Sequence, residues 1–406
     1  MSSEGLFDDL RIIELGQGVS AAFCAKLFAD LGAEVIKVEP PDGEIARRRG
    51  PFAGDEPGPE RSGLFAYLNT SKYGVTLDAG SDKGREIFTE LVTISDILIE
   101  NNSPAWMAEA QLDYKHLQKS NPSLIMTSIT PFGQDGPWRD YLGNDFIVQH
   151  TSGVAFHNGA RVKDTEAQPP ILIPGFMGEF AGGLAAASAT MCALFGQMAG
   201  DEGAHVDVAL QQALAMNLQV DVTRVTYADQ VPSRSASAIP PVPFVGQQPA
   251  ADGYIDYVVR TQEQWHNMLD VLGNPEWAKS ELFATLKSRS QYWDALEPLI
   301  QQETRRFTKE HLFRESQAKG VSAAAVNTVA DAAKAEHFQD RGSFAEFEHP
   351  VLGKLRCPGP PIRFDGDFWG IRRPAPLLGQ HNAEIYSKRL GYQDKDLAAL
   401  SKAGVI

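Results

Sequence analysis

The chain has 406 residues, 43% of them hydrophobic and 22% charged, an ordinary globular composition that is long enough for two domains. Its formal net charge of −15 argues against a nucleic-acid-binding protein. Its three cysteines (Cys24, Cys192 and Cys357) lie far apart and form no CxxC motif, which fits a reducing cytoplasm and provides neither a disulfide framework nor a zinc set.

The first part of the chain predicts an alternation of strands and helices. LRIIEL (10–15) is typical of a short buried strand, residues 19–32 have helical spacing and end at Gly32, and AEVIKVE (33–39) is typical of a second strand. Such a βαβ unit favours a parallel sheet with crossover helices. The alternation continues with strands at 73–78, 96–101 and 123–129 and with helices at 83–94 and 105–119.

A long uncharged run lies between Phe180 and Gly200. It has the length of a membrane span, but it is rich in Ala, Gly, Ser and Thr rather than Leu, Ile and Val, so we expect a buried, closely packed helix and no membrane insertion. The N-terminal MSSEGLFDDL has acidic residues where a secretory signal has a basic and then an apolar region. Both observations favour a cytoplasmic protein.

The second half of the chain begins with a strand at 205–210 and a further helix. A proline-rich stretch between about 224 and 252 indicates a domain boundary or an active-site loop, and DGYIDYVV (252–259) starts a new unit with several helices. From about residue 340 the chain has strand-like pieces and then two short helices.

Two patterns in the first part of the chain suggest anion binding. Gly16-x-Gly18-x-x-Ala21 follows a strand and opens a helix, and Glu39 ends the next strand, which is the pattern of dinucleotide-binding folds. The tight turn of any βαβ unit also needs small residues, so an NAD(P)-dependent oxidoreductase is one hypothesis among others. The run RRRG (47–50) either clamps a phosphate or forms a solvated loop face. The nine histidines form no HExxH motif, and no metal site is expected.

Glu179, in IPGFMGEFAGG, is a carboxylate at the head of the small-residue run. In the first turn of a helix a carboxylate is favoured by the helix dipole. A carboxylate held near the free amides of a helix start is also a possible nucleophile on an acyl group. The residue types alone leave three interpretations open: a helix-start residue, a working nucleophile, or the remnant of a site that no longer works.

Seven segments in order resemble the class III CoA-transferases, the family of formyl-CoA transferase and carnitine CoA-transferase. The resemblance runs from about residue 10 to the C-terminus. The segments are the following: LGAEVIKVEPP, LNTSKYGVTLD, DILIENNSP, NPSLIMTSITPFGQDGP with GNDFIVQHTSG, GAHVDVALQQALA, ADGYI and APLLGQHNAEI.

The resemblance implies an α/β fold with a Rossmann-like large domain, a smaller α+β domain and an interlocked dimer. The large domain would comprise residues 1–220 and 326–406, and the small domain residues 225–325. It implies a reaction in which a carboxylate attacks the thioester of an acyl-CoA, so that coenzyme A is a substrate and no metal takes part. It places Glu179 at the nucleophile position, and it implies CoA-binding roles for six residues: Val19, Ser20, Asn69, Lys72, Asn101 and Asn102.

The sequence departs from the family pattern around this site. The family's nucleophile is an Asp, whereas Glu179 is one methylene longer, and a shift of about 1 Å in a reacting atom has a large effect on rate. Asn102 and Glu109 replace a phenylalanine and a phosphate-binding arginine, and a carboxylate repels a phosphate. The family's glycine-rich loop has no clear counterpart, because PPVPFVGQQ occupies its region.

These departures favour the less active or non-catalytic subunit of a heteromer, of the kind found in succinyl-CoA:(R)-benzylsuccinate CoA-transferase. The partner would be a paralogous CoA-transferase chain, and the donor a dicarboxylate such as succinyl-CoA, with succinate or an aryl succinate from aromatic degradation as the acid. The alternative is an active homodimer in which Glu179 is the nucleophile.

Overall fold

The computed structural model describes residues 5–158, 162, 164–232, 234, 246–366 and 368–406. The chain divides into two compact units. The first comprises Met1–Gly159, Pro169–Pro232 and Gly342–Ile406, and the second comprises Ala160–Gln168 and Ser233–Arg341. The ranges expected from the sequence (1–220, 225–325 and 326–406) follow the same order, and as domain boundaries they stay a prediction.

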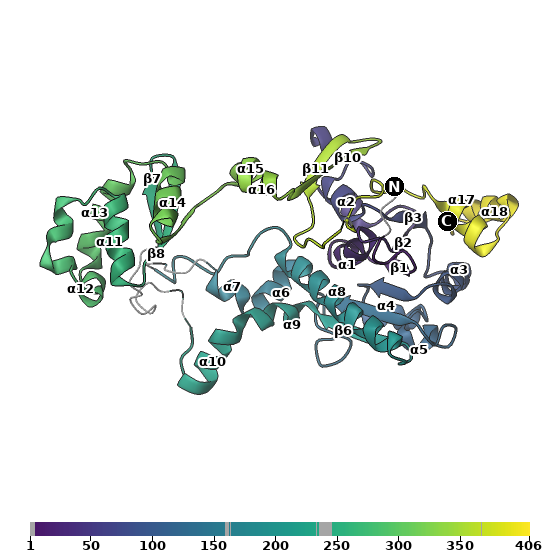
Figure 1. Ribbon diagram of the computed structural model, residues 1–406. Helices are drawn as coiled ribbons and strands as arrows, with labels where there is room; N and C mark the ends of the chain where they lie inside the picture. Colours follow the sequence, from purple (N-terminus) through teal and green to yellow (C-terminus); the bar gives the residue numbers. More distant parts are fainter. Residues whose placement is uncertain (1–4, 159–161, 163, 233, 235–245, 367) are drawn as a thin grey trace. The chain divides into compact units, whose positions relative to one another are not determined.

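The first unit is built on a parallel sheet of six strands, as the βαβ pattern predicts (Figure 1). The strands are β1 (Arg11–Leu15), β2 (Glu34–Glu39), β3 (Tyr73–Thr76), β4 (Ile97–Glu100), β5 (Ile125–Thr130) and β6 (Ala204–Ala209). Their order is β3-β2-β1-β4-β5-β6, so the direction of winding reverses between β1 and β4. At such a switch point a ligand fits in the crevice beyond the carboxyl ends of the strands.

Helices cover both faces of the sheet, because alternate strand residues point to opposite sides. Ile12 of β1 belongs to one apolar core and Ile13 to the other. The helices of the first core are α1 (Ser20–Ala29), α8 (Met177–Met198) and α9 (Leu210–Ala215). Those of the second are α3 (Asp82–Thr93), α4 (Pro104–Glu109), α5 (Tyr114–Leu117), α17 (Asn382–Leu390) and α18 (Asp394–Lys402).

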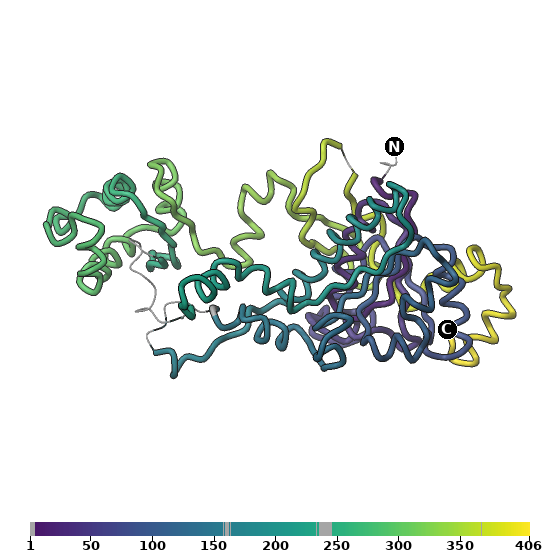
Figure 2. Tube along the Cα trace, turned by 90° about the horizontal axis from the view of Figure 1, so that it is seen from below, coloured from purple at the N-terminus to yellow at the C-terminus, as the bar shows by residue number. Residues whose placement is uncertain are grey.

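The C-terminal segment covers the edge strand β3. The amide of Gly74 donates to Nδ1 of His381 (3.0 Å), and the amide of Thr76 donates to Oδ1 of Asn382 (2.8 Å). Figure 1 shows the C-terminal helices on the side of β3, and in Figure 2 the yellow C-terminal segment lies against the blue part of the chain. The two ends of the chain therefore build one domain, and the exposed backbone groups of the sheet edge are satisfied.

Helix α8 contains the uncharged run, and by length and composition alone it is long and apolar enough to cross a membrane. It packs closely against its neighbours through glycines, as expected, but the expectation of a buried helix is wrong for its other face, where Leu184 and Phe195 are exposed. A Cβ added to Gly183 would lie 2.7 Å from the backbone oxygen of Ser20 in α1, and one added to Gly182 would lie 2.1 Å from Cδ2 of Leu210. The small residues thus allow α1 and α8 to approach. The cytoplasmic location stays a prediction.

The remaining elements of the first unit are short. They are α2 (Gly63–Leu68), α6 (Asp145–Thr151), α7 (Val154–His157), α10 (Gln219–Ala228) and the antiparallel pair β10 (Phe344–His349) and β11 (Gly353–Pro358).

The second unit has an antiparallel sheet with helices around its own apolar core. Its strands are β7 (Gly246–Ala250), β8 (Gly253–Val258) and β9 (Ser322–Ala325). Its helices are α11 (Gln262–Val271), α12 (Leu286–Gln291), α13 (Trp293–Thr304), α14 (Lys309–Ala318), α15 (Val329–Lys334) and α16 (Glu336–Asp340). This is the smaller α+β part that we expected. Most of PPVPFVGQQ (240–248) lies outside the described residues, since only 246–248 of it are described.

Candidate active site

The loop between β1 and α1 offers three successive amides, and each of them donates to a side chain of the protein. The amide of Gln17 donates to Oδ1 of Asn101 (2.8 Å), that of Gly18 to Oε2 of Glu44 (2.9 Å), and that of Val19 to Oε2 of Glu179 (3.1 Å). Gly18 has a φ of +74°, which glycine adopts without strain. In a dinucleotide-binding loop such amides receive pyrophosphate, whereas here they hold an amide and two carboxylates.

Glu179 lies in the first turn of α8, but it does not cap this helix. The amides of Gly178 and Glu179 donate to Oδ1 of Asp145, at 2.7 and 3.1 Å. Asp145 therefore satisfies two of the four amides that a helix start leaves without a partner. Glu179 lies in the first turn, as the helix-start interpretation predicts, but its carboxylate accepts from the amide of Val19 and from no amide of its own helix.

The electrostatic setting of Glu179 is mixed. Burial raises the pKa of its carboxyl above the usual value, against the opposing effects of the Val19 amide and the nearby Arg49 guanidinium. The charge of Asp145 raises this pKa further. A carboxylate with a raised pKa is a stronger base than usual, and the side chain stays partly exposed. The Glu179 carboxylate is thus held by the Val19 amide and is still accessible to a substrate.

Asp145 and Gln149 are functional candidates that the sequence reasoning missed. They lie one turn apart on α6, and Nε2 of Gln149 donates to Oδ2 of Asp145 (2.8 Å). Gln149 also makes two hydrogen bonds with the backbone of Ile173, each 3.0 Å long. The pair therefore holds residues 173–179 in place. The i, i+4 spacing of Asp and Gln in GNDFIVQH was the available signal.

Asn101 and Asn102, both predicted to bind CoA, lie where β4 ends. Besides accepting from Gln17, Asn101 donates to the Gln17 carbonyl (2.7 Å) and to Oγ of Ser20 (3.1 Å). Asn102 donates through its side chain to the Leu15 carbonyl (2.7 Å). Both asparagines hold the β1–α1 segment. A direct role of either residue, or of Val19 and Ser20, in CoA binding stays a prediction.

Glu100 lies directly before these asparagines, and its side chain is fully buried. The amide of Asn102 donates to its Oε2 (2.7 Å). Burial raises the pKa of its carboxyl to about 7, so that it is partly protonated at neutral pH.

Asn69 and Lys72, also predicted to bind CoA, are fully buried. The ammonium of Lys72 contacts Oε2 of Glu14 (2.7 Å), the Ala22 carbonyl (2.8 Å) and Oδ1 of Asn69 (2.9 Å). The other oxygen of Glu14 contacts the ammonium of Lys37 (2.6 Å). In this structure the two predicted residues thus belong to a buried ion cluster, and their contact with CoA stays a prediction.

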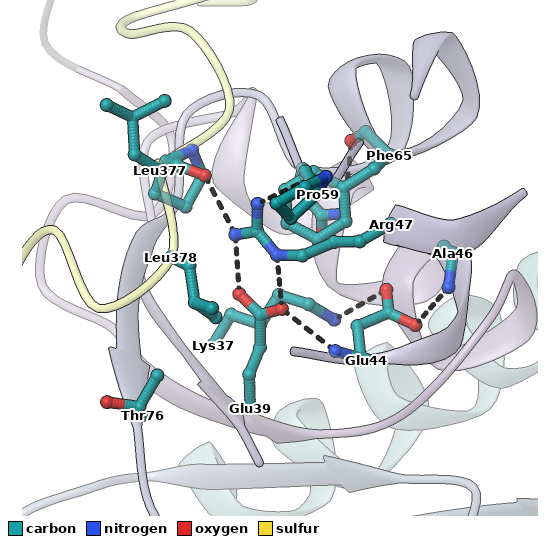
Figure 3. A network of polar contacts seen from close by, with 12 residues as sticks. Lys37, Glu39, Glu44, Ala46, Arg47, Pro59, Phe65, Thr76, Leu377 and Leu378 are labelled. Atoms are coloured by element: carbon teal, nitrogen blue, oxygen red, sulfur yellow. Dashed lines mark hydrogen bonds and ion pairs between the residues drawn. The ribbon is translucent and has the colours of Figure 1, made fainter. Parts of the chain in front are cut away.

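The three arginines of RRRG differ from one another. Arg47 is buried and meets Glu39 through Nε and Nη2 (2.7 and 2.8 Å) and Glu60 through Nη1 (2.8 Å), as Figure 3 shows for Glu39. Arg48 is exposed and pairs with Asp42. The guanidinium of Arg49 lies 5.5 Å from the ring centroid of Phe176, three residues before Glu179. Arg48 fits the solvated loop face and Arg47 fits neither alternative, while phosphate binding by the run stays a prediction.

A pocket of about 430 Å³ lies at the carboxyl ends of β1 to β4. Gly16 and Gln17 line it on one side and Asn102 and Trp106 on another. Its size suits a bound small molecule. Glu109, which replaces the expected arginine, is exposed in the last turn of α4. Among the described residues, no three His, Cys, Asp or Glu side chains are placed to hold a metal ion.

Comparison with known proteins assigns the family. The profile of CoA-transferase family III matches residues 7–382. The chain is 29% identical over 403 residues to the succinyl-CoA–D-citramalate CoA-transferase of Chloroflexus aurantiacus, covering 98% of each chain. It is 29% identical over 389 residues to the succinate–glutarate CoA-transferase of Agrobacterium fabrum, covering 93% of this chain and 94% of the relative.

A solved structure shares the fold. The crystal structure of a CaiB/BaiF family protein from Brucella suis superposes with a TM-score of 0.84 at 29% identity, covering 95% of this chain and 99% of that one. The family assignment replaces the oxidoreductase hypothesis, in agreement with the occupied loop amides. The family profile and these relatives show that the chain belongs to CoA-transferase family III and is a class III CoA-transferase.

Proposed function

We propose that this chain transfers CoA between carboxylic acids with its own nucleophile, Glu179. One observation carries the proposal: Asp145 caps α8, and the Glu179 carboxylate accepts instead from the Val19 amide at 3.1 Å. A carboxylate used only to stabilise the helix start would be expected to face the amides of its own helix.

The chemistry follows from this arrangement. One oxygen of Glu179 attacks the thioester carbonyl carbon of the acyl-CoA, and the C–S bond breaks. CoA thiolate is released, and the acyl group remains on Glu179 as a mixed anhydride. The thiolate then attacks the glutamyl carbonyl carbon, which frees the first acid and forms a glutamyl thioester. The acceptor carboxylate next attacks the glutamyl thioester, which releases CoA thiolate and forms a second mixed anhydride. The thiolate then attacks the acceptor's carbonyl carbon in this anhydride, which forms the new acyl-CoA and frees Glu179. The Val19 amide is positioned to donate to the negative oxygen that develops on the glutamyl group.

The pocket of about 430 Å³ is the proposed place for the nucleotide half of CoA. The β1–α1 loop supports this proposal, because Gly16 and Gln17 line the pocket and Val19 contacts Glu179. An acyl-CoA bound in this pocket would therefore extend along the β1–α1 loop, with its thioester end towards Glu179.

The proposed donor is the CoA thioester of a dicarboxylate such as succinate. The names of two relatives support it, since both refer to succinyl-CoA or succinate. The acceptor is a second carboxylic acid, and an aryl succinate stays a prediction.

The test is Glu179→Gln, which keeps the shape and removes the nucleophile. We expect CoA transfer from succinyl-CoA to fall by a factor of at least about 1,000. Hydroxylamine added during turnover should label Glu179 in the wild-type chain. The exposed Glu202→Gln serves as the matched control and should leave transfer unchanged. Full activity of Glu179→Gln without labelling would refute the proposal.

A second candidate is the less active subunit of a heteromer. It is favoured by Glu179 in place of the family's Asp and by Glu109 at the expected arginine position. In that case the chain purified alone shows no transfer, and activity appears with a paralogous chain that has Asp at the nucleophile position. Turnover by the lone chain would exclude this candidate.

In either case we propose that two chains, identical or paralogous, form an interlocked dimer. An apolar groove of about 700 Å³ supports this, because Leu184 (54% exposed) and Met191 (36% exposed) of α8 line it together with Pro360, Ile362 and Phe364. Leu184→Glu should lower the dimer fraction in light scattering. An unchanged dimer would mean that this groove is not part of the interface.

A further inference from the structure

Arg49 differs from its two neighbours in having no carboxylate partner. The structure gives ion pairs to Arg47 (with Glu39 and Glu60) and to Arg48 (with Asp42), whereas no Asp or Glu among the described residues lies within 4.0 Å of the Arg49 guanidinium. In a chain with a net charge of −15, a half-buried arginine without an acidic partner is notable. A partly desolvated guanidinium gains from an anion that it binds.

The position of Arg49 connects it with the nucleophile. Its guanidinium lies 5.5 Å from the ring centroid of Phe176, the residue that precedes α8. Its charge also acts on Glu179, since it opposes the rise in the pKa of that carboxyl. The cation is therefore within electrostatic reach of the oxygen that would carry the acyl group.

The backbone of Arg49 is held on both sides. Its amide donates to the Ala46 carbonyl (3.1 Å), and its carbonyl accepts from Oγ of Ser62 (2.6 Å), the residue that caps α2. Because the backbone is already held, mainly the side chain can move. Binding an anion therefore costs little backbone conformational entropy.

We infer that Arg49 binds the distal carboxylate of a dicarboxylic acyl group while the proximal carbonyl faces Glu179. Arg49 is thereby the residue that selects diacid thioesters over monoacid thioesters. This inference rests on the proposed function, and it names the substrate class of the same site. A planar guanidinium, which can donate two parallel hydrogen bonds to one carboxylate, matches this role.

The competing explanations predict different results. If Arg49 only adjusted the pKa of Glu179, or if it met a phosphate of CoA, its loss would affect every acyl-CoA equally. A pair of donors that differ only in the distal group, succinyl-CoA and butyryl-CoA, separates these cases because the CoA part is the same.

The experiment compares Arg49→Met with wild type, and uses Arg48→Met, which alters the adjacent exposed arginine, as the matched control. With Arg49→Met we expect kcat/KM for succinyl-CoA to fall by about 10- to 100-fold, and that for butyryl-CoA to change by less than about threefold. Arg48→Met should change neither. An equal loss with both donors, or no loss with succinyl-CoA, overturns the inference.

A binding measurement keeps the inference testable without turnover. In the Glu179→Gln background, calorimetry should show that adding Arg49→Met weakens succinyl-CoA binding by about tenfold or more and leaves butyryl-CoA binding nearly unchanged. Equal affinity of the Glu179→Gln protein for the two thioesters would overturn the inference. If the wild type shows no CoA transfer but the preference for succinyl-CoA binding is observed, the result counts against Glu179 as the nucleophile and not against the role of Arg49.

Discussion

The charged residues around Glu14 and those around Glu179 differ in how completely their charges are balanced. Around Glu14, two carboxylates (Glu14 and Glu44) and two ammonium groups (Lys37 and Lys72) are all fully or almost fully buried, and Glu14 contacts both lysines at 2.6 and 2.7 Å. In the second group, Glu179 and Arg49 are partly exposed and form no direct ion pair. Buried charges must be paired, whereas a working site needs charges that remain available to a substrate.

The pKa values express the same difference. The lysines lower the pKa of Glu14 despite the opposing effect of burial, and burial lowers the pKa of Lys72 to about 8 while Glu14 opposes this change. Glu179, by contrast, has a raised pKa, since burial outweighs the donors around it. The first group is arranged for stability, whereas the second contains the proposed nucleophile.

The largest stability effect is expected from Glu14→Gln, which breaks the balanced group. Two buried ammonium groups lose their shared carboxylate, and the free energy of unfolding should fall by about 3–5 kcal/mol. Urea denaturation measures this change. The exposed Glu86→Gln, which breaks only the surface pair with Lys83, is the control and should cost less than about 1 kcal/mol. Similar values for both variants would contradict the comparison.

Glu100 provides a pH-dependent test beside the same loop. Its pKa is raised from 4.5 to about 7, so the folded state binds the proton more tightly than the unfolded state. The stability that it contributes is therefore fully present below pH 4.5 and is lost as the pH rises through 7. Relative to Glu100→Gln, the wild type should lose roughly 3 kcal/mol between pH 4.5 and 8. Parallel pH profiles of the two proteins would show that Glu100 does not titrate in this range.

Gly183→Ala tests the contact that brings α8, with its proposed nucleophile Glu179, to α1. The added Cβ would lie 2.7 Å from the rigid backbone oxygen of Ser20, and we expect a loss of about 1–3 kcal/mol in unfolding free energy, together with slower transfer. The control is Gly196→Ala in the same helix, where the Cβ meets only the end of the Asp201 side chain. That variant should be neutral or gain up to about 1 kcal/mol from helix propensity. Equal losses would mean that the helix, and not the contact, is sensitive to the change.

The smallest stability effect is expected from Glu179→Gln. Since burial disfavours the charged carboxylate and the amide oxygen of Gln still accepts from Val19, urea denaturation should show a change within about 1 kcal/mol. The same substitution is expected to abolish transfer. A loss of stability as large as that of Glu14→Gln would make Glu179 a structural residue and would remove the contrast between the two groups.

The sequence by itself determined the α/β fold and the place of the candidate site. The strand and helix periods are local properties of segments such as 10–39, and the small-residue run after Glu179 predicts a closely packed helix from its composition alone. The ordered family motifs then predicted which carboxylate lies at the nucleophile position. All of these features depend on residues that are close together in the chain.

Only the tertiary structure decided which partners the polar groups find. The amides of Gln17, Gly18 and Val19 donate to residues 84, 26 and 160 positions further along the chain, and no local pattern specifies such choices. Three adjacent arginines were equivalent in the sequence, yet Glu39 and Glu60 pair with Arg47 alone, and Phe176 contacts Arg49. Asn69 and Lys72 were predicted from the sequence to bind CoA, and only the packing shows that Lys72 contacts both Glu14 and Asn69. Ion pairing depends on which distant charges the folded chain brings together, because a buried charge without a partner is energetically costly.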